Sequence, residues 1–449
     1  MKEKYDLIYK QLVSSYYNNC FENTLEQIIR TDFEDKDEAK EVIASLCGVD
    51  SVYTKDDGEF IFRIIDNITN NRVRSKIIQK IRGCESDCES IEGKSKCQGV
   101  CPLDAIVKKP FSNEKYIDKN LCINCGRCVE VCDGGNYLET SQFLPLANLL
   151  RSGQKVFAIV APAIAGQFGK DVTLDMMRES FIKMGFEDMI EVALAADALS
   201  YKEAIEFDHH VEKKEDFMIS SCCCPVWVAM LKKVYKDLIP EVSPSVSPMI
   251  AMGRIIKRLN EEAKVVFIGP CMAKKAEAKE EDIKDAVDYV LTFHEVQLIF
   301  DALKIEPDKL KGVPAIDYAS RGGRLYARTG GVSQAVWDIV DQLYPEKRKL
   351  YSSVQADGVK NCRQILKDLE EGKVRATFIE GMACEGGCVG GPKVNIPREE
   401  GRKAAEQTAY DSAVKIPVHS TVFNEMLQRI GLKDMDDFKN KTQIFERDF

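Results

Sequence analysis

From about residue 150 onward, short apolar runs of the kind that form strands alternate with stretches that have a helical pattern. The runs span 155–160, 217–220, 264–268 and 375–379, and the clearest helical patterns span 226–235 and 249–259. This alternation predicts an α/β fold with an open, largely parallel sheet. Ligands of such sheets bind beyond the carboxyl ends of the strands. Three of the four runs lead into a cysteine motif and the fourth leads into Ala161-Pro162-Ala163, so we expect a sulfur-rich site at these ends.

The composition narrows the class of protein. The chain has 449 residues, a net charge of −9 and a pI near 5.4, which argues against a nucleic-acid or anionic-membrane partner. It has only four histidines but 17 cysteines. The N-terminus lacks the apolar core of a signal peptide, so we expect a cytoplasmic protein. In that reducing compartment the cysteines are expected to have metal or redox roles.

Four segments differ in character. We expect a helical N-terminal segment over 1–80, a small cysteine-dense domain over 81–145, an α/β domain over 146–400 and a helical tail over 401–449. In the first segment, Glu38–Leu46 reads as a helix that begins after Asp35 or Asp37 and ends at Gly48. Cys20 and Cys47 have no ligand-like spacing there and are interpreted as ordinary buried residues. We interpret this segment as a packing or docking unit.

The cysteine-dense segment contains Cys122-x2-Cys125-x2-Cys128-x3-Cys132, the run that binds 4Fe–4S clusters in bacterial ferredoxins. A zinc site is the weaker alternative, because zinc motifs rarely use three such intervals. Four more cysteines lie upstream, and two-cluster ferredoxins exchange their fourth ligands. The expected sets are Cys84, Cys88, Cys97 and Cys132 for one cluster and Cys101, Cys122, Cys125 and Cys128 for the other.

Three further motifs follow strand-like runs: Ser221-Cys222-Cys223-Cys224-Pro225, Gly269-Pro270-Cys271-Met272-Ala273-Lys274 and Glu380-Gly381-Met382-Ala383-Cys384-Glu385-Gly386-Gly387-Cys388. Three consecutive cysteines are unsuited to form a structural disulfide with one another, because a disulfide needs a specific geometry. Four thiolates at one sheet edge could instead hold a further iron–sulfur cluster. Pro225 suits the first turn of a helix, whose positive end would favour an anionic cluster.

Together these motifs resemble those of the FeFe hydrogenases, whose patterns are Thr-Ser-Cys-Cys-Pro, Met-Pro-Cys-x-x-Lys and Glu-x-Met-Ala-Cys-x-x-x-Cys. The resemblance covers residues from about 81 to 400 and implies an α/β hydrogenase domain beside a two-cluster ferredoxin-like domain. It implies an H-cluster, which is a 4Fe–4S cubane joined to a di-iron subsite that carries CO, cyanide and an azadithiolate. By this resemblance the cubane ligands are Cys224, Cys271, Cys384 and Cys388, and Cys388 also bridges to the di-iron subsite.

The resemblance implies roles for residues around that cluster. Cys223 matches the non-ligand cysteine that passes protons to the bridging amine, a role that suits a thiol. Lys274 would hydrogen-bond one cyanide. Ala161 and Pro162 resemble the backbone that contacts the other cyanide, and Met382 resembles the methionine that packs against the di-iron unit. Such neighbours tune and seat a metal group.

A proton path is also implied. Residues 195–206 resemble the family's path segment, and Ser243 and Ser247 resemble its serine partners. The implied order is solvent, Glu206, Ser243, Glu203, Cys223 and the amine. Glu203 and Glu206 are three residues apart and can share a helix face. Without the resemblance, both glutamates would be interpreted as solvated surface charges.

The chain departs from the family pattern at several positions. Gly269 replaces a methionine, Ala165 replaces an arginine, and His210 stands where an arginine often closes the proton path. The glycine run after Val389 is shorter than usual. Cys222 replaces a serine: it is either a small loop residue or a residue that loosens the loop so that Cys223 can shield the open iron from oxygen. Cys362 has no partner spacing and is interpreted as structural.

Three functions are therefore considered. The first is a hydrogenase that catalyses 2H⁺ + 2e⁻ ⇌ H2, with ferredoxin or another one-electron carrier as partner and with maturation proteins that supply the di-iron unit. The second is a hydrogen sensor with low turnover that reports to a signalling partner, which the altered pocket residues favour. The third is an iron–sulfur assembly factor without the di-iron unit, which would not need Cys223, Lys274 or the proton path.

Overall fold

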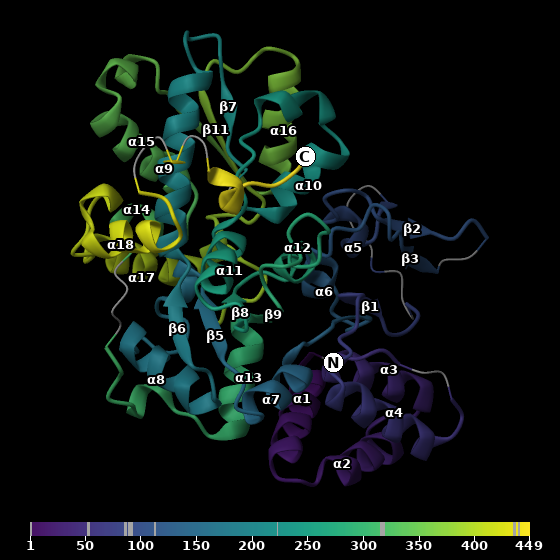
Figure 1. Ribbon diagram of the computed structural model, residues 1–449. Coiled ribbons are helices and arrows are strands. Elements are labelled where there is room, and N and C mark those ends of the chain that lie inside the picture. The colour runs from purple at the N-terminus through teal and green to yellow at the C-terminus, as the bar shows by residue number, and fades with distance from the viewer. Residues whose placement is uncertain are drawn as a thin grey trace. The chain divides into compact units, whose positions relative to one another are not determined.

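The computed structural model describes residues 2–51, 54–84, 88, 93–111, 114–221, 223–314, 319–433, 437–438 and 441–449. The chain divides into two compact units (Figure 1). Unit 1 comprises Met1–Gln154 and His294–Glu306, and unit 2 comprises Lys155–Phe293 and Pro307–Phe449. Each unit is described separately below.

Unit 1 begins with a group of helices, drawn in purple in Figure 1. They are α1 (Lys2–Tyr17), α2 (Phe21–Gln27), the π-helical turn η1 (Ile28–Asp32), α3 (Lys36–Cys47) and α4 (Asp57–Thr69). The boundaries of α3 match the sequence prediction. The Asp35 side chain accepts a hydrogen bond from the Asp37 N–H, and Gly48 ends the helix with a φ of 76°, a conformation that glycine adopts at low cost.

The two cysteines of this helical group differ in exposure. Cys47 is buried on α3, and burial raises the pKa of its thiol. Cys20 is exposed at the start of α2. The prediction of a buried cysteine is therefore confirmed for Cys47 and wrong for Cys20, because Cys20 occupies the turn between two helices and not a packed helix face.

The cysteine-dense part of unit 1 has only short elements. These are β1 (Ile78–Lys80), α5 (Lys96–Gly99), β2 (Ile106–Lys108), β3 (Lys115–Ile117), α6 (Arg127–Val131) and β4 (Tyr137–Glu139). Strand β1 pairs antiparallel with β4, and β2 pairs antiparallel with β3. The helices α7 (Phe143–Arg151) and α13 (Phe293–Leu303) follow this region in the chain.

Unit 2 contains a four-stranded parallel sheet in the order β6-β5-β8-β9. Its strands are β5 (Val156–Val160), β6 (Asp188–Glu191), β8 (Lys264–Gly269) and β9 (Tyr289–Thr292). Strand β5 is mostly buried Val, Ala and Ile, and it lies between β6 and β8. Apolar strands of this kind suit a parallel sheet that is covered on both faces.

A second parallel sheet in unit 2 has the order β10-β11-β7. Its strands are β7 (Met218–Ile219), β10 (Ser353–Asp357) and β11 (Phe378–Met382). The four predicted strands are thus divided between two open sheets and do not form a single one. Strand β11 begins three residues later than the predicted run at 375–379, because the side chain and backbone of Thr377 bond to Leu350 and Ser352 before the ladder begins.

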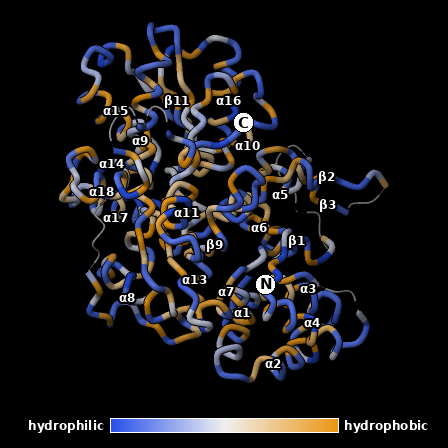
Figure 2. Tube along the Cα trace, in the orientation of Figure 1, coloured by the Kyte–Doolittle hydropathy of each residue, from blue (hydrophilic) through white to orange (hydrophobic). Residues whose placement is uncertain are grey.

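Helices surround these sheets. They are α8 (Leu174–Met184), α9 (Ala193–His210), α10 (Pro225–Lys233), α11 (Pro248–Leu259), α12 (Ala273–Glu277), α14 (Arg321–Leu325), α15 (Gly331–Leu343), α16 (Val359–Glu370), α17 (Arg398–Tyr410) and α18 (Thr421–Arg429). Hydrophobic and hydrophilic residues alternate along most of them in Figure 2, as expected for helices with one buried face. Helix α9 is an exception because it is buried along most of its length.

The segment expected to be a helical tail contains most of α17, all of α18 and the short turn Thr442–Phe445. The last residues are not helical, and Glu446 forms an antiparallel bridge with Ser245. Among the described residues, no helix combines the length and apolarity that a bilayer crossing requires.

Candidate functional site

The candidate site is built at the ends of four parallel strands in unit 2. Strand β5 runs into Ala161 and Pro162, and β8 runs into the Cys271 motif. In the second sheet, β7 runs into the first cysteine motif and β11 runs into the third. Parallel strands bring their carboxyl ends to one edge. The predicted link between strand ends and cysteine motifs is therefore present, although it draws on two sheets.

Cys224 stands at the N-terminus of α10, and Pro225 is the first helical residue, as the sequence predicted. Burial raises the pKa of the Cys224 thiol, while backbone N–H groups of Ala383, Trp227 and Val226 act in the opposite direction. The Ala383 N–H belongs to the third cysteine motif. Cys224 therefore lies against the loop that carries Cys384, more than 150 residues away in the chain.

Cys271 lies between β8 and α12. Burial and, to a smaller extent, the nearby Cys224 raise the pKa of its thiol to about 12, although the Lys274 ammonium opposes both effects. A thiol is deprotonated when it binds iron, so a cationic neighbour helps to keep the sulfur anionic in a buried place. The spacing from Cys271 to Lys274 is the one that the family pattern contains.

The third motif forms a tight loop after β11. Gly386 and Gly387 have φ values of 80° and 88°, which a residue with a Cβ rarely adopts. A Cβ at Gly387 would also lie 2.6 Å from the backbone nitrogen of Thr329. The Gly386 N–H donates to Asp357 at 2.7 Å. These glycines let the loop between Cys384 and Cys388 turn closely against neighbouring backbone.

Cys223, Cys388 and Lys274 meet in this site. The Cys223 thiol donates a hydrogen bond to the sulfur of Cys388 and thereby lowers the pKa of Cys388. The Lys274 ammonium donates to the Cys223 carbonyl at 3.1 Å and pairs with Glu277 at 2.7 Å. Burial alone would lower the pKa of Lys274, but the charges of Glu277 and Cys223 outweigh it and raise the pKa. Lys274 therefore stays a cation beside the thiols.

Glu380, the first residue of the third motif, has a structural role. Its buried carboxylate accepts hydrogen bonds from the Gly330 N–H and from the N–H and hydroxyl of Ser333, at 2.7–2.8 Å. These donors belong to the first turn of α15, so Glu380 caps that helix from a neighbouring strand. Burial raises the pKa of Glu380. The sequence motif includes Glu380, but only the structure shows that this residue caps a helix.

The remaining predicted neighbours lie at the strand ends. The Ala161 N–H donates to Ile268 at 2.9 Å, which ties the end of β5 to β8. Met382 is buried at the last position of β11. Gly269 departs from the family methionine, and a Cβ there would lie 2.6 Å from the ring of Phe267. The Phe267 ring thus fills part of the space that the missing side chain would occupy.

Trp227 joins two of the cysteine loops. Its ring lies flat against Gly381, so that a Cβ at Gly381 would fall 2.2 Å from the ring. Its indole N–H donates to the Ser220 carbonyl at 2.9 Å. Trp227 is buried on α10, three residues after Cys224, and Gly381 lies three residues before Cys384. This contact holds the first and third motifs together.

The four residues of the implied proton path lie in this same unit. Ser243 donates to Glu206 at 2.6 Å, as the implied order requires. Glu203 is fully buried and accepts from the Ser220 hydroxyl at 2.9 and 3.0 Å. Ser247 is buried at the start of α11, and its hydroxyl oxygen has no hydrogen-bond partner among the described residues. Ser220 was missed in the sequence because a serine at a strand end carries no distinctive pattern.

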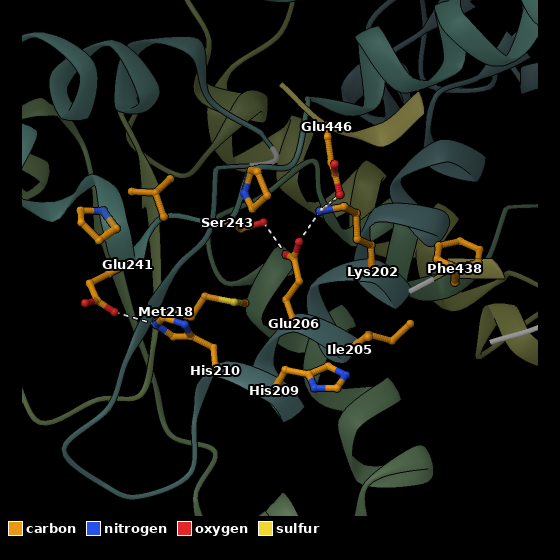
Figure 3. A pocket seen from close by; sticks show the side chains of 13 residues that line it. Lys202, Ile205, Glu206, His209, His210, Met218, Glu241, Ser243, Phe438 and Glu446 are labelled. Carbon is orange, nitrogen blue, oxygen red and sulfur yellow. Dashed lines mark hydrogen bonds and ion pairs between the residues drawn. The ribbon is translucent and has the colours of Figure 1, made fainter. Parts of the chain in front are cut away.

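A cavity of about 400 Å³ lies at the outer end of this path (Figure 3). Glu206 and Ser243 line it together with Lys202, His210 and Glu241. The His210 ring nitrogen lies 2.6 Å from the Glu241 carboxylate. His210 and Glu206 therefore line the same cavity. Lys202 forms an ion pair with Glu206 and was not identified from the sequence.

The described cysteines of unit 1 lie near one another. Cys101, Cys122, Cys125 and Cys128 line one small cavity. Burial, together with the nearby thiols of Cys101 and Cys122, raises the pKa of Cys125 to about 12. Of the other set, Cys84 and Cys97 raise the pKa of Tyr137, and Cys88 and Cys132 both lie near Lys96.

The donor sets fit iron–sulfur clusters better than single metal ions. Among the described residues, no three His, Cys, Asp or Glu side chains converge on one point. A cubane spreads its thiolates around several iron atoms, so it needs grouped but separated sulfurs. Cys222 lies outside the described residues. Cys362 is buried on α16, and its thiol contacts the Ala356 carbonyl at 3.8 Å, as expected for a structural residue.

The fold and the grouped thiols define an iron–sulfur protein of the α/β class with a sulfur-rich site at its strand ends. The family model described as "Iron only hydrogenase large subunit, C-terminal domain" matches residues 154–392, and a 4Fe–4S binding-domain model matches residues 115–135. The chain belongs to the iron-only, or FeFe, hydrogenase family.

Curated relatives include hydrogenases and other proteins. The chain is 28% identical to the NADP-reducing hydrogenase subunit HndD of Solidesulfovibrio fructosivorans over 69% of this chain and 62% of that protein. It is 28% identical to iron hydrogenase 1 of Clostridium pasteurianum, over 73% and 76% of the two chains. It is also 24% identical to cytosolic iron-sulfur assembly component 3 of Rattus norvegicus, over 65% and 74%.

Solved structures support the fold. An FeFe hydrogenase examined for oxygen inactivation aligns with a TM-score of 0.58 and 21% identity, over 69% of this chain and 98% of that chain. The apo FeFe hydrogenase HydA1 of Chlamydomonas reinhardtii, in a variant form, aligns with a TM-score of 0.54 and 20% identity, over 66% and 94%. The predicted α/β hydrogenase fold with open sheets is thereby confirmed.

Proposed function

We propose that this protein is an FeFe hydrogenase that catalyses 2H⁺ + 2e⁻ ⇌ H2. The observation that carries the proposal is the Cys223 thiol, which contacts Cys388 beside the Lys274 ammonium. A thiol in this position can give and take a proton next to the cluster ligands. The residues Glu206 and Ser243 supply a hydrogen-bonded connection toward a cavity. An assembly factor would have no need of either feature.

The proposed cofactor is an H-cluster held by Cys224, Cys271, Cys384 and Cys388. When bound, it would supply the iron at which protons and electrons combine. The Lys274 ammonium is buried with the thiols and is suited to donate a hydrogen bond to an anionic ligand such as cyanide. Met382 and the Ala161-Pro162 turn would pack around the same group.

The proposed proton route uses side chains of the described residues. Glu206 exchanges a proton with the cavity and passes it to the Ser243 hydroxyl, which lies 2.6 Å away. Glu203 receives it in the protein interior, where the Ser220 hydroxyl orients its carboxylate. Cys223 then delivers the proton to the cluster. A chain of this kind is efficient because each group both accepts and donates.

The proposed electron route uses the cysteine-dense part of unit 1. Two 4Fe–4S clusters bound by the predicted cysteine sets would accept single electrons from ferredoxin or another one-electron carrier. Maturation proteins would be needed to supply the di-iron unit. We propose the same division of the chain into segments, 1–80, 81–145, 146–400 and 401–449, with the first as a packing or docking unit.

A hydrogen sensor is the second candidate function. It is favoured by Gly269, where the chain lacks the family methionine and Phe267 fills part of the space. A changed contact beside the di-iron unit could slow turnover without preventing cluster binding. A sensor would also need a signalling partner.

The experiment that separates these functions uses the full chain, purified without oxygen and matured with the di-iron unit. Infrared bands of CO and cyanide report cluster assembly, and gas measurement reports H2 production and uptake. Bands together with fast turnover support the hydrogenase, and bands with very slow turnover support the sensor. If the matured protein binds two or three cubanes but shows no CO and cyanide bands, the hydrogenase and the sensor proposals are both rejected. Cys388→Ala is the matched control for cluster assembly.

A further inference from the structure

The C-terminal segment 443–449 of unit 2 lies directly on the serine loop 243–247. The Val246 N–H donates to the Phe445 carbonyl at 2.8 Å, and the Arg447 N–H donates to the Pro244 carbonyl at 2.9 Å. Glu446 is thereby paired opposite Ser245. This segment lies beyond residue 392, where the match to the hydrogenase family model ends.

Several contacts anchor this segment. The Arg254 guanidinium donates to the backbone carbonyls of Gln443, Ile444 and Glu446 at 2.7–3.4 Å. Phe445 is fully buried and stacks on Phe438, with ring centres 5.7 Å apart. Burying an aromatic ring removes a large apolar surface from water, so these contacts make the segment an integral part of unit 2.

The end of the segment is fixed by charge. Arg447 is 8% exposed, and its guanidinium pairs with Glu280 and, at 3.2 Å, with Asp282. A buried arginine with two carboxylate partners is costly to displace, because either side would lose a charge partner in a poorly solvated place. The Arg447 pairing therefore holds the bridge between Glu446 and Ser245.

Lys202 connects this segment with the proposed proton path. It lies on α9 and is 3% exposed. Its ammonium pairs with Glu206, donates to the Ser245 hydroxyl at 3.3 Å and lies 3.6 Å from Glu446 (Figure 3). The Ser243 hydroxyl donates to Glu206 at 2.6 Å and lies 2.9 Å from the Ser245 hydroxyl. One buried cation thus links the C-terminal segment, the serine loop and the outermost carboxylate of the path.

We propose that residues 443–449 form a strap that fixes the Lys202 ammonium, and that Lys202 acts as a positioning residue that keeps the Glu206 carboxylate directed at Ser243. The cavity also presents His209, His210, Glu241 and Glu446. The ion pair with Lys202 and the hydrogen bond from Ser243 hold the two oxygens of the Glu206 carboxylate. Without Lys202, the Glu206 carboxylate is free to turn toward the cavity and away from Ser243. The catalytic part of this inference rests on the proposed hydrogenase function.

The test begins with protein that lacks the di-iron unit, so that its outcome does not depend on turnover. The infrared stretching bands of the Glu206 carboxylate, assigned by their loss in Glu206→Gln, report the contacts of that group. In Lys202→Met we expect these bands to shift, because the carboxylate has lost its charged hydrogen-bond donor. Lys202→Arg should keep the bands near those of the parent. Glu446→Gln should shift them less, and Glu425→Gln, an exposed change on α18, should not shift them.

Hydrogen exchange tests the strap itself. Arg447→Gln should release the end of the segment and raise the exchange rate of peptides covering 243–247 by about tenfold. Lys360→Met, an exposed lysine on α16, serves as a control that should leave exchange unchanged. An unchanged rate in Arg447→Gln, or identical Glu206 carboxylate bands in Lys202→Met and the parent, overturns the inference.

Turnover of the matured protein completes the test. Lys202→Met should lower H2 turnover about tenfold with CO and cyanide bands intact, and Lys202→Arg should restore most of it. If the matured parent shows no turnover while the carboxylate bands and hydrogen exchange change as expected, the hydrogenase proposal fails and the strap stands. If the parent is active and Lys202→Met is equally fast, the role in proton transfer is excluded.

Discussion

The two cysteine-rich regions of this chain are built in different ways. In unit 2, the cluster-binding loops begin at buried parallel strands and are tied by Trp227 and Glu380. In unit 1, the cysteines lie among strands of three residues and helices of four and five residues. Elements this short bury little apolar surface. We predict that the first region keeps its fold without a cluster, whereas the second depends on its clusters for order.

The largest expected effect tests the first half of that comparison. Cys388→Ala should abolish H2 turnover by more than about a thousandfold, because it removes the proposed bridge between cubane and di-iron unit. Unit 2 should still fold, since the loop is held by Gly386, Gly387 and their backbone contacts. Gas measurement checks the activity, and near-ultraviolet circular dichroism checks the fold. Loss of both together would mean that the scaffold needs its cluster.

A smaller loss is expected when the cluster stays and the proton carrier is removed. Cys223→Ala should lower turnover about a hundredfold, the usual size of a lost general acid and base. The CO and cyanide bands should remain. A Cys223→Ala protein that turns over at the parent rate would show that protons reach the site by another route.

Removal of iron should affect the order of the two cysteine-rich regions differently. Chelation under reducing conditions should speed proteolytic cleavage within 93–142 about tenfold, because that region loses its clusters. Cleavage within the α/β part of unit 2, residues 155–293, should change little. Equal loss of order in both regions would contradict the proposed difference.

The smallest effect concerns the packing beside the site. Gly269→Met should destabilise unit 2 by about 1 kcal/mol, because the new side chain collides with the Phe267 ring. The double variant Phe267→Ala with Gly269→Met should lose less stability than the two single variants added together, because the new side chain fills space that the ring leaves. Thermal unfolding of the parent and the three variants measures the difference. Additive losses in the double variant would show that the two residues do not share one space.

Much of the fold could be predicted from the sequence because apolar strands and cysteine motifs alternate in it. The run at 155–160 became β5 with a change of one residue at its start. Strand β10 was missed, because Ser353–Asp357 is largely polar and lies at a sheet edge, where it has no clear apolar pattern. The division into two sheets also could not be foreseen, since it depends on which strands pair over long distances.

The candidate site was predictable where residues carry chemistry in a fixed spacing. The cysteines and Lys274 belong to this group. Lys202, Ser220 and the strap residues could not be predicted. A single lysine or serine has no distinctive sequence pattern, and its role depends on the residues that the fold brings into contact with it. For Cys20, the prediction from residue type was wrong. Its residue type favours burial, but its position in a turn leaves it exposed.

The contact of the Trp227 ring with Gly381 has a consequence for electron transfer. It clamps the helix that follows Cys224 onto the strand that precedes Cys384, with no side chain between ring and backbone. Sulfur ligands that cannot shift apart leave a cluster little room to change its bond lengths when its charge changes. A small structural adjustment for each electron lowers the barrier to its arrival and departure. A bulkier residue at position 381 would thus slow redox exchange before it removed any ligand.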